Sequence, residues 1–232
     1  MRGVVRRPPR RGKPFFPHQI LGRALPRAHA GGVDADYHIH ELDGASLAPW
    51  LDALGGLRIR VFRDYPYLYE GSLEYERDYL TIYQNARDSL VVIVTDNAGK
   101  AVGATTCLPM AEEGPEFQEP FLKAGIDVSR VFYFGESILL PEWRGRGIGK
   151  LFFDLREAHA RKLGYAITTF CAVDRPADHP LRPAGYRPLD TFWESRGYQK
   201  QAGLQATFTW KEIGEESESP KTLTFWTHAW NA

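Results

Sequence analysis

The stretch Pro141-Glu142-Trp143-Arg144-Gly145-Arg146-Gly147-Ile148-Gly149-Lys150 lies between an apolar run, residues 131–140, and a helical run that begins at Ile148. Its three glycines allow a tight turn whose backbone N–H groups converge at the start of a helix, where the helix dipole attracts anions. Arg144, Arg146 and Lys150 add positive charge to the same turn. The stretch therefore predicts a binding site for phosphate groups between a strand and a helix.

The spacing argues against two common nucleotide-binding motifs. A Walker loop would need Gly at position 144 and Ser or Thr at position 151, where the chain has Arg144 and Leu151. A dinucleotide fingerprint that starts at Gly145 would need glycine at position 150, which is Lys150. A P-loop nucleotide hydrolase is therefore disfavoured. A glycine-rich turn whose basic residues serve only solubility remains an alternative.

Hydrophobic periodicity on both sides of this turn predicts a mixed α/β architecture. Strands are expected at residues 37–42, 89–95, 101–108, 131–140, 165–173, 206–210 and 222–226, and helices at 47–62, 72–86, 148–163 and 189–196. Ser72 is a candidate helix cap, and Gly164 is expected to end the helix at 148–163, with Glu157 and Arg161 as an exposed pair. Residues 109–129, rich in Gly, Pro and Glu, are expected to form a loop.

The composition is that of a globular protein. The chain has 232 residues, 43% hydrophobic and 25% charged, which is enough for a sizeable core and excludes a disordered chain. No stretch approaches the ~18 uninterrupted apolar residues of a membrane-spanning helix, so we expect no membrane association.

The formal net charge is zero, but the charges are unevenly placed. Residues 1–33 hold eight Lys or Arg and no acid, and residues 34–232 hold 21 bases against 29 acids. The acidic body argues against a nucleic-acid-binding protein. We expect residues 1–33 to be a disordered basic leader, with a targeting peptide and a polyanion-binding arm as alternatives, and residues 36–232 to be the folded domain.

The cysteines and histidines give no sign of a metal or disulfide site. Cys107 and Cys171 lack CxxC spacing and lie in apolar runs, which fits inert thiols in the cytoplasm. His38 and His40 share a strand face, but two imidazoles without a third ligand are weak support for a metal, so we predict none.

Two segments together resemble a known family. Residues 139–149, with the pattern Arg-x-x-Gly-x-Gly, resemble the strand end and pyrophosphate loop of the GNAT superfamily of acetyl-CoA-dependent N-acetyltransferases. Residues 191–198 are similar to that family's Phe-Tyr-Glu-x-x-Gly-Phe helix. The resemblance implies an α/β fold with a central mixed β-sheet flanked by helices in a single domain. It also implies direct transfer of an acetyl group from acetyl-CoA to an amine, without an acyl-enzyme.

The resemblance also implies which residues hold the cofactor. The amides of the glycine loop would bind the pyrophosphate of coenzyme A, and the strand end would pair with its pantetheine arm. The N–H of Leu139 would polarise the thioester carbonyl. The candidate cofactor-binding residues are Ile138, Leu139, Leu140, Arg144, Gly145, Arg146, Gly147, Ile148, Gly149 and Lys150.

The same comparison suggests catalytic residues. Glu136 is the candidate base, because its apolar strand would raise its pKa toward neutrality; a structural Glu tied to amides or to an arginine is the alternative. The family's proton-donating tyrosine falls at Trp193, whose indole is no useful acid. Tyr186, in an insertion at residues 174–190, is the leading replacement, followed by His179, Cys171 and solvent.

The acceptor site is expected in the segment between the first two strands. Residues 64–78 hold five acids against one base, and six tyrosines lie between positions 65 and 83. Tyr65, Tyr67, Tyr69 and Tyr79 are the candidate substrate-binding residues, because aromatic rings and carboxylates attract a cationic amine. An amphipathic helix with half-buried tyrosines is the alternative. The proline-rich insertion could form the opposite wall.

These observations predict an acetyltransferase that acts on a primary amine of a small cationic molecule. A peptide terminus or a lysine is an alternative acceptor. A non-catalytic sensor or interaction module that binds coenzyme A is a further alternative, because positions 186 and 193 depart from the family. Apolar groups in the final strands could cover a second copy in a homodimer.

Overall fold

Seven strands form one mixed sheet in the computed structural model, which describes residues 36–230. The sheet order is β1-β2-β3-β4-β5-β7-β6, and only β4 and β5 run parallel. The strands are β1 (Tyr37–Leu42), β2 (Leu90–Asp96), β3 (Ala101–Pro109), β4 (Val131–Leu139), β5 (Ile167–Val173), β6 (Gln199–Trp210) and β7 (Ser219–Ala229). The predicted disordered leader, residues 1–33, lies outside the described residues.

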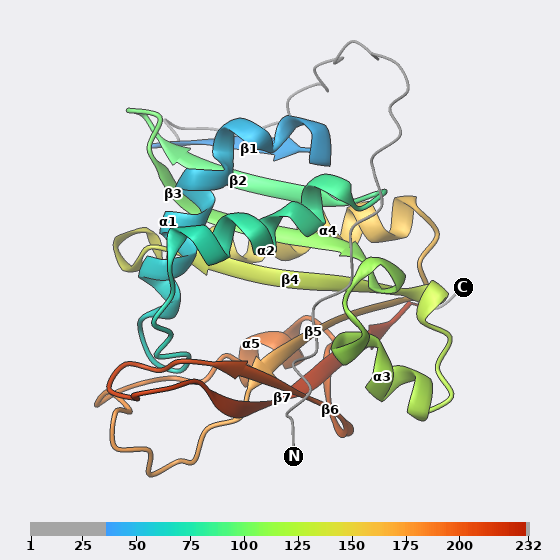
Figure 1. The fold of residues 1–232 in the computed structure, drawn as a ribbon. Coiled ribbons are helices and arrows are strands. Elements are labelled where there is room, and N and C mark those ends of the chain that lie inside the picture. Colours follow the sequence, from blue (N-terminus) through green and yellow to red (C-terminus); the bar gives the residue numbers. More distant parts are fainter. Residues whose placement is uncertain (1–35, 231–232) are drawn as a thin grey trace, which may run out of the picture. The chain divides into compact units, whose positions relative to one another are not determined.

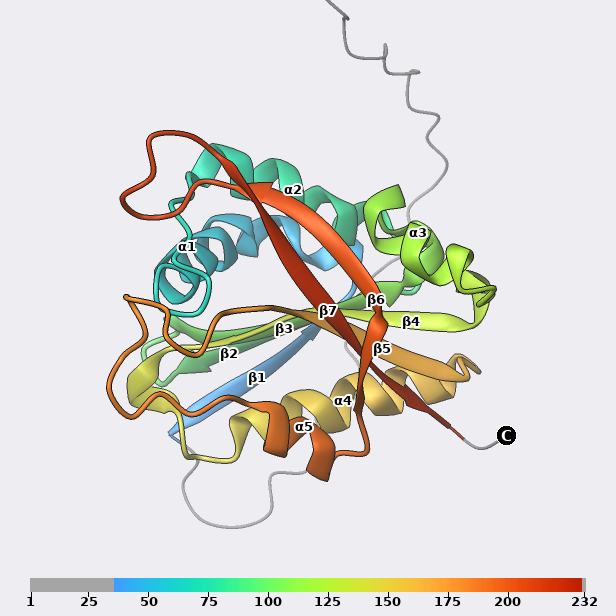
Figure 2. The same cartoon turned by 90° about the horizontal axis from the view of Figure 1, so that it is seen from below.

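Helices cover both faces of this sheet (Figures 1 and 2). They are α1 (Leu51–Phe62), α2 (Leu73–Asn85), α3 (Pro115–Lys123), α4 (Ile148–Lys162) and α5 (Asp190–Ser195). Figure 2 shows α1 and α2 on one side of the sheet and α4 and α5 on the other. None of the helices in residues 36–230 is both long and apolar enough to cross a membrane.

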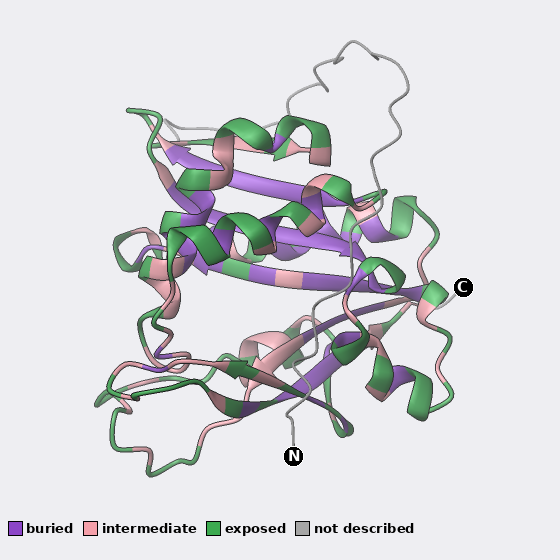
Figure 3. Ribbon diagram, in the orientation of Figure 1, coloured by how far each residue is buried: buried purple, intermediate pink, exposed green. Residues whose placement is uncertain are grey.

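The core lies in the central strands, where burial is greatest (Figure 3). Strand β2 reads LVVIVTD, and all but its last residue are buried. Continuous apolar runs of this kind suit a strand that is covered on both faces. The predicted α/β class and single domain are therefore confirmed.

Several local predictions are confirmed at the level of single residues. The side chain of Ser72 accepts a hydrogen bond from the Tyr75 N–H at 3.3 Å and so caps α2. Gly164 has a φ of +85° just after α4, a conformation that favours glycine and ends the helix.

The predicted loop at 109–129 was wrong, because it contains the helix α3. Phe117 and Phe121 are buried on one face of this helix, at the i,i+4 spacing. Phe117 packs on Phe208, with ring centroids 4.5 Å apart, and Phe121 packs on Phe225 at 4.9 Å. Burial of each phenylalanine is worth about 2 kcal/mol, which offsets the low helix propensity of Pro120.

The predicted exposed pair of Glu157 and Arg161 was also wrong. Glu157 is only 5% exposed, and its Oε2 lies 2.5 Å from Nη2 of Arg196, which follows α5. Helix α4 contacts α5 as well as the sheet. More of its circumference is therefore buried than its row of apolar residues predicts.

The apolar groups that suggested a possible homodimer have packing partners within the chain. Strand β7 lies inside the sheet between β5 and β6, and Trp226 is 2% exposed. Trp230 packs against His228 and Arg161, with distances of 3.9 and 4.8 Å. The apolar groups expected to cover a second copy are therefore covered within the chain.

Candidate active site

A β-bulge in β4 turns Glu136 away from α4. Thr105 pairs with Ser137 and Cys107 pairs with Phe134, so Gly135 and Glu136 together oppose one residue of β3. The bulge reverses the alternation of side chains: Phe134 packs on Phe153 of α4, whereas Glu136 bonds to an arginine of α1. Without the bulge, Glu136 would follow Phe134 onto the α4 side.

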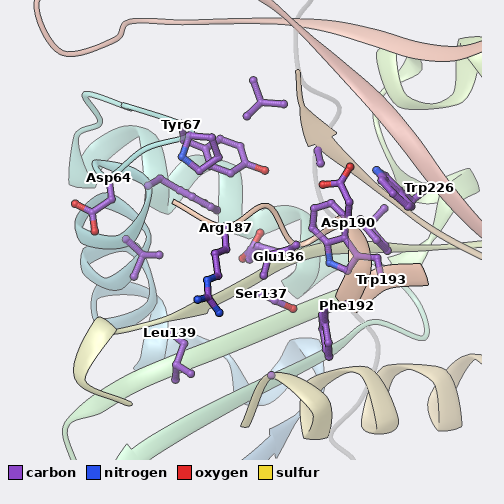
Figure 4. A pocket seen from close by; sticks show the side chains of 18 of the residues that line it. Asp64, Tyr67, Glu136, Ser137, Leu139, Arg187, Asp190, Phe192, Trp193 and Trp226 are labelled. Carbon is purple, nitrogen blue, oxygen red and sulfur yellow. The ribbon is translucent and has the colours of Figure 1, made fainter. Parts of the chain in front are cut away.

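Next to this bulge, β4 and β5 separate. They pair only from Val131 to Tyr133, opposite Ile167 to Thr169, and β5 then continues with β7 alone (Figure 1). A cavity of about 890 Å³ opens at the separation. Its walls come from β4, β5, the glycine loop, the α1–α2 connection, the insertion after β5 and α5 (Figure 4).

The glycine loop forms an open cradle at the start of α4. Gly145 and Gly147 have φ values of +76° and +80°, which favour glycine. Apart from chain neighbours and the backbone of the same helix, no described atom lies within 4 Å of a Cβ built at Gly145, Gly147 or Gly149. No side chain in residues 36–230 caps α4, and its first turn holds no acid. Its first N–H groups therefore have no intrahelical partner. This donor set fits the two phosphates of coenzyme A.

The three cations of the loop take different positions. Arg144 lines the cavity, and its Nε donates to the carbonyl of Leu139 at 3.3 Å. Arg146 stacks over Trp143 at 4.5 Å and pairs with Asp36 at 3.4 Å. Lys150 is exposed and does not line the cavity. Arg144 is thus the loop cation that faces the cavity.

The end of β4 presents one of its three predicted cofactor residues to the cavity. The N–H of Leu140 donates to Val102 of β3 at 2.9 Å, so the N–H of Leu139 points to the opposite side, where β5 has separated. Leu139 lines the cavity, whereas Ile138 and Leu140 are buried and do not. Ser137, on the same side as Leu139, also lines it and was missed by the sequence analysis.

Glu136 is tied to an arginine and also faces the cavity. It lines the cavity, and its Oε2 lies 2.5 Å from Nη1 of Arg58 on α1. The Nε of Arg58 bonds to Glu76 on α2. Oε1 of Glu136 is buried and has no hydrogen-bond partner among the described residues. Burial raises the pKa of Glu136, and Arg58 opposes that rise.

The predicted acceptor tyrosines divide into two groups. Tyr65 and Tyr67 line the cavity, and the hydroxyl of Tyr67 points into it (Figure 4). Tyr69 and Tyr79 do not line it; Tyr79 packs on the guanidinium of Arg58 at 4.3 Å. The geometry thus gives Tyr79 a place in the Arg58 network and not in the acceptor wall.

Tyr186 reaches the same wall from the insertion. Its ring stands edge-on to Tyr65, with centroids 4.7 Å apart, and both line the cavity. Burial raises its pKa, so its hydroxyl keeps its proton at neutral pH. Trp193 also lines the cavity, packed against Phe170 and Trp226.

The other two acid candidates are less suited. His179 lies against Tyr65, at 5.5 Å between ring centroids, and does not line the cavity. Cys171 does line it, but its thiol is already in contact with the hydroxyl of Tyr133 at 3.3 Å. Tyr186 therefore has the best position of the three.

Charged residues from the insertion complete the cavity. Arg187 extends into it toward β4, and Asp190 and Asp64 lie on opposite sides of Arg187 (Figure 4). Arg187 has no acidic partner within 4 Å in the part of the chain that the structure describes. The sequence indicates the insertion but gives no signal for Arg187 or Asp190, because neither belongs to a recognisable motif.

The described residues contain no group of three or more His, Cys, Asp or Glu able to hold a metal ion. His40 instead bonds to Thr95 at 3.0 Å and packs on Trp50.

Comparisons with known proteins agree with this geometry. The sequence model of the Acetyltransferase (GNAT) family matches residues 57–184, more than half of the chain. No curated protein matches significantly.

Solved structures share the fold at low sequence identity. One is a ribosomal-protein-alanine N-acetyltransferase from Brucella melitensis, 15% identical, with a TM-score of 0.54 over 83% of this chain and 99% of that one. A second is a putative acetyltransferase from Salmonella typhimurium with its cofactor acetyl-CoA, 11% identical, with a TM-score of 0.54 over 85% and 96%. A third is a putative acetyltransferase from Acinetobacter baylyi, 8% identical, with a TM-score of 0.55 over 85% and 95%.

The family match covers the bulged strand, the glycine loop and the following helix, and the folds agree over nearly the whole length of the solved proteins. The chain therefore belongs to the GNAT family of acetyl-CoA-dependent acetyltransferases.

Proposed function

We propose that this enzyme transfers the acetyl group directly to a primary amine of a small molecule that binds between Tyr65, Tyr67 and Tyr186. The observation that carries the proposal is the continuity of the cavity. One cavity extends from Arg144 and Gly149, past the free edge of β4, to this cluster of tyrosines. Both reactants can therefore meet beside Glu136.

The chain offers a defined partner for each part of the cofactor. Acetyl-CoA supplies an activated acetyl thioester. The N–H groups of the glycine loop and the guanidinium of Arg144 would hold its pyrophosphate. The outward N–H of Leu139 would donate to the thioester carbonyl, where negative charge develops during attack.

Two side chains would handle protons. Oε1 of Glu136, which has no partner in residues 36–230, would accept the proton that the amine loses. Tyr186 would donate a proton to the departing thiolate, the role for which Trp193 is unsuited. Neither transfer needs an acyl-enzyme.

A small cationic acceptor fits the far end of the cavity. Tyr65 and Tyr67 offer aromatic faces, and Asp64 and Asp190 offer carboxylates for an ammonium group. Arg175 holds the insertion against the α1–α2 connection, and residues of both segments line the acceptor end of the cavity. Walls from two segments favour a small molecule over a peptide terminus or a lysine. The two free cysteines fit an activity in the cytoplasm.

Calorimetry with acetyl-CoA tests the cofactor site. The double variant Gly147→Glu, Arg144→Ala should abolish binding, because it places a carboxylate in the phosphate cradle and removes the cavity-facing cation. Gly125→Glu is a matched control, since Gly125 is another exposed glycine with positive φ, after α3. Undiminished binding to the double variant would refute the proposed cradle.

Release of free thiol across a panel of amines tests the chemistry. The enzyme should release thiol with at least one small primary amine, and Glu136→Gln should abolish this turnover while acetyl-CoA still binds. Binding without amine-dependent thiol release would favour a sensor module.

A further inference from the structure

Three side chains behind the cavity form a buried triad with more acid than base. The guanidinium of Arg58 contacts Glu136 through Nη1 and Glu76 through Nε. The exposed fractions of the three side chains are 9% for Arg58, 2% for Glu136 and 0% for Glu76. The arginine is further enclosed by Tyr79 at 4.3 Å and Phe62 at 5.1 Å.

No second cation contacts the carboxylate oxygens of Glu76 or Glu136 in residues 36–230, and Arg156 acts on Glu136 only through space and through its backbone. Arg156 of α4 donates to the backbone carbonyl of Glu136 at 3.3 Å, and its charge is stacked on Phe134 and Phe153. Thr106 of β3 accepts a hydrogen bond from the backbone N–H of Glu136.

The remaining titratable neighbours are acids. Tyr79 and Tyr83 of α2, Glu113 before α3 and Tyr67 of the α1–α2 connection interact electrostatically with Glu136. Each of them would add negative charge if it ionised. Arg58 is thus the one cation that contacts the carboxylate groups of Glu76 and Glu136 among the described residues.

A single arginine cannot neutralise two buried carboxylates. An uncompensated charge in the interior is strongly unfavourable, so the triad is most stable when one of its acids holds a proton. Glu76 has no exposed side-chain surface, whereas Glu136 lines the cavity. Glu136 is therefore the acid of the pair that can exchange a proton with the cavity, and because burial raises its pKa, its ionised form is a stronger proton acceptor than an ordinary carboxylate.

We propose that Glu76 is a positioning residue for acetyl transfer. Glu76 shares the single positive charge of Arg58 with Glu136, so the charge of Glu136 is only partly neutralised. Glu136 therefore stays a strong proton acceptor. This inference rests on the proposed role of Glu136 as the base. Arg58 orients Glu136 through Oε2 and leaves Oε1 without a hydrogen-bond partner among the described residues. Glu76 limits how far Arg58 can stabilise the ionised form of Glu136.

Glu76→Gln tests the inference through pH dependence. Glutamine keeps an oxygen that can accept the hydrogen bond from Arg58 but removes one negative charge. Arg58 then serves Glu136 alone, so the acidic limb of the kcat/KM profile should move to lower pH by about one unit. A carboxyl infrared band that titrates in the protein without substrates, and is absent from Glu136→Gln, should move in the same direction. Glu74→Gln, an exposed acid on the same helix, should move neither.

Thermal unfolding of Glu136→Gln supplies a test that does not depend on Glu76→Gln being folded. If Glu136 is a surplus acid, its replacement should leave the melting temperature at pH 8 equal to or above that of the unaltered enzyme. A marked fall at pH 8 would show that Arg58 and Glu136 form a balanced pair, and it would overturn the inference.

The remaining outcomes separate this inference from the proposed function. An unmoved infrared band in folded Glu76→Gln, or movement to higher pH, overturns the role of Glu76 whatever the activity. Full turnover by Glu136→Gln overturns the base on which the inference rests, even if the triad titrates as described. In Glu76→Gln, movement of both the infrared band and the acidic limb of the kcat/KM profile to lower pH supports the role of Glu76.

Discussion

Nε of Arg175 lies 2.6 Å from the carbonyl oxygen of Pro66, which joins the insertion after β5 to the α1–α2 connection. The same guanidinium donates to the carbonyl of Tyr67 at 3.2 Å and contacts Glu212 at 2.5 Å. The side chains of Arg175 and Glu212 are each 10% exposed. One arginine therefore fixes two walls of the cavity relative to each other.

Arg175→Ala should raise the KM for the amine acceptor and leave acetyl-CoA affinity nearly unchanged, because the affected walls are distant from the glycine loop. It should also lower the free energy of unfolding by about 2 kcal/mol, since Glu212 loses one charged hydrogen-bond partner and keeps Lys221 at 3.5 Å. Steady-state kinetics, calorimetry and denaturant unfolding measure the three quantities. Lys211→Ala removes only an exposed pair with Glu70 and should have little effect. An unchanged acceptor KM in folded Arg175→Ala would contradict the prediction.

The backbone N–H of Leu139 can be tested separately from its side chain. Proline at position 139 removes an N–H that points away from β3, so the β3–β4 ladder keeps its hydrogen bonds. If this N–H polarises the thioester carbonyl, Leu139→Pro should lower kcat by about 10²–10³-fold, as loss of an oxyanion donor does in other enzymes. Leu139→Ala keeps the N–H and controls for the lost side chain. Equal kcat values for the two folded variants would exclude the N–H from this role.

Local signals were sufficient for most of the fold. The glycine-rich turn between β4 and α4 was predicted correctly as a turn, because the positive φ of two of its glycines and the start of its helix depend on adjacent residues. The cap at Ser72 depends on a residue only three positions away. Helix α3 was missed because its stability comes from Phe208 and Phe225, which are distant in sequence.

The site was harder to predict than the fold for the same physical reason. Arg58 meets Glu76 and Glu136 across 18 and 78 positions, and its own helix gives no signal of either contact. The bulge that turns Glu136 toward Arg58 arises from register between β3 and β4, which single-strand periodicity cannot show. Glu136 was identifiable as an acid in an apolar strand, but its partner was not.

Glu113 should make stability depend on pH. Burial raises its pKa from 4.5 to about 7. Below pH 4.5 the Glu113 carboxyl group is protonated in both the folded and the unfolded chain. Between pH 4.5 and 7 the unfolded chain releases this proton while the folded chain keeps it. The free energy of unfolding therefore falls as the pH rises. The loss is complete above pH 7 and amounts to about 3 kcal/mol.

Glu113→Gln should therefore be more stable than the unaltered enzyme at pH 8 and equally stable near pH 4. Glutamine stays neutral and can still accept the N–H of Gly114, which Glu113 binds at 3.3 Å. Thermal melts across this pH range measure the difference. Glu119→Gln changes an exposed acid of α3 that does not contribute to the raised pKa of Glu113, and it should follow the pH dependence of the unaltered enzyme. A parallel pH dependence in Glu113→Gln would show that Glu113 is ionised in the folded protein.

Tyr186→Phe tests whether the insertion replaces the acid that Trp193 cannot supply. Phenylalanine keeps the edge-on packing with Tyr65 and removes only the hydroxyl. If that hydroxyl protonates the thiolate, kcat should fall by about tenfold or more while the KM for acetyl-CoA stays constant. Tyr65→Phe removes a hydroxyl from the neighbouring ring and should change kcat much less. A kcat that survives in Tyr186→Phe would assign protonation to solvent, and the insertion would then serve only to enclose the acceptor.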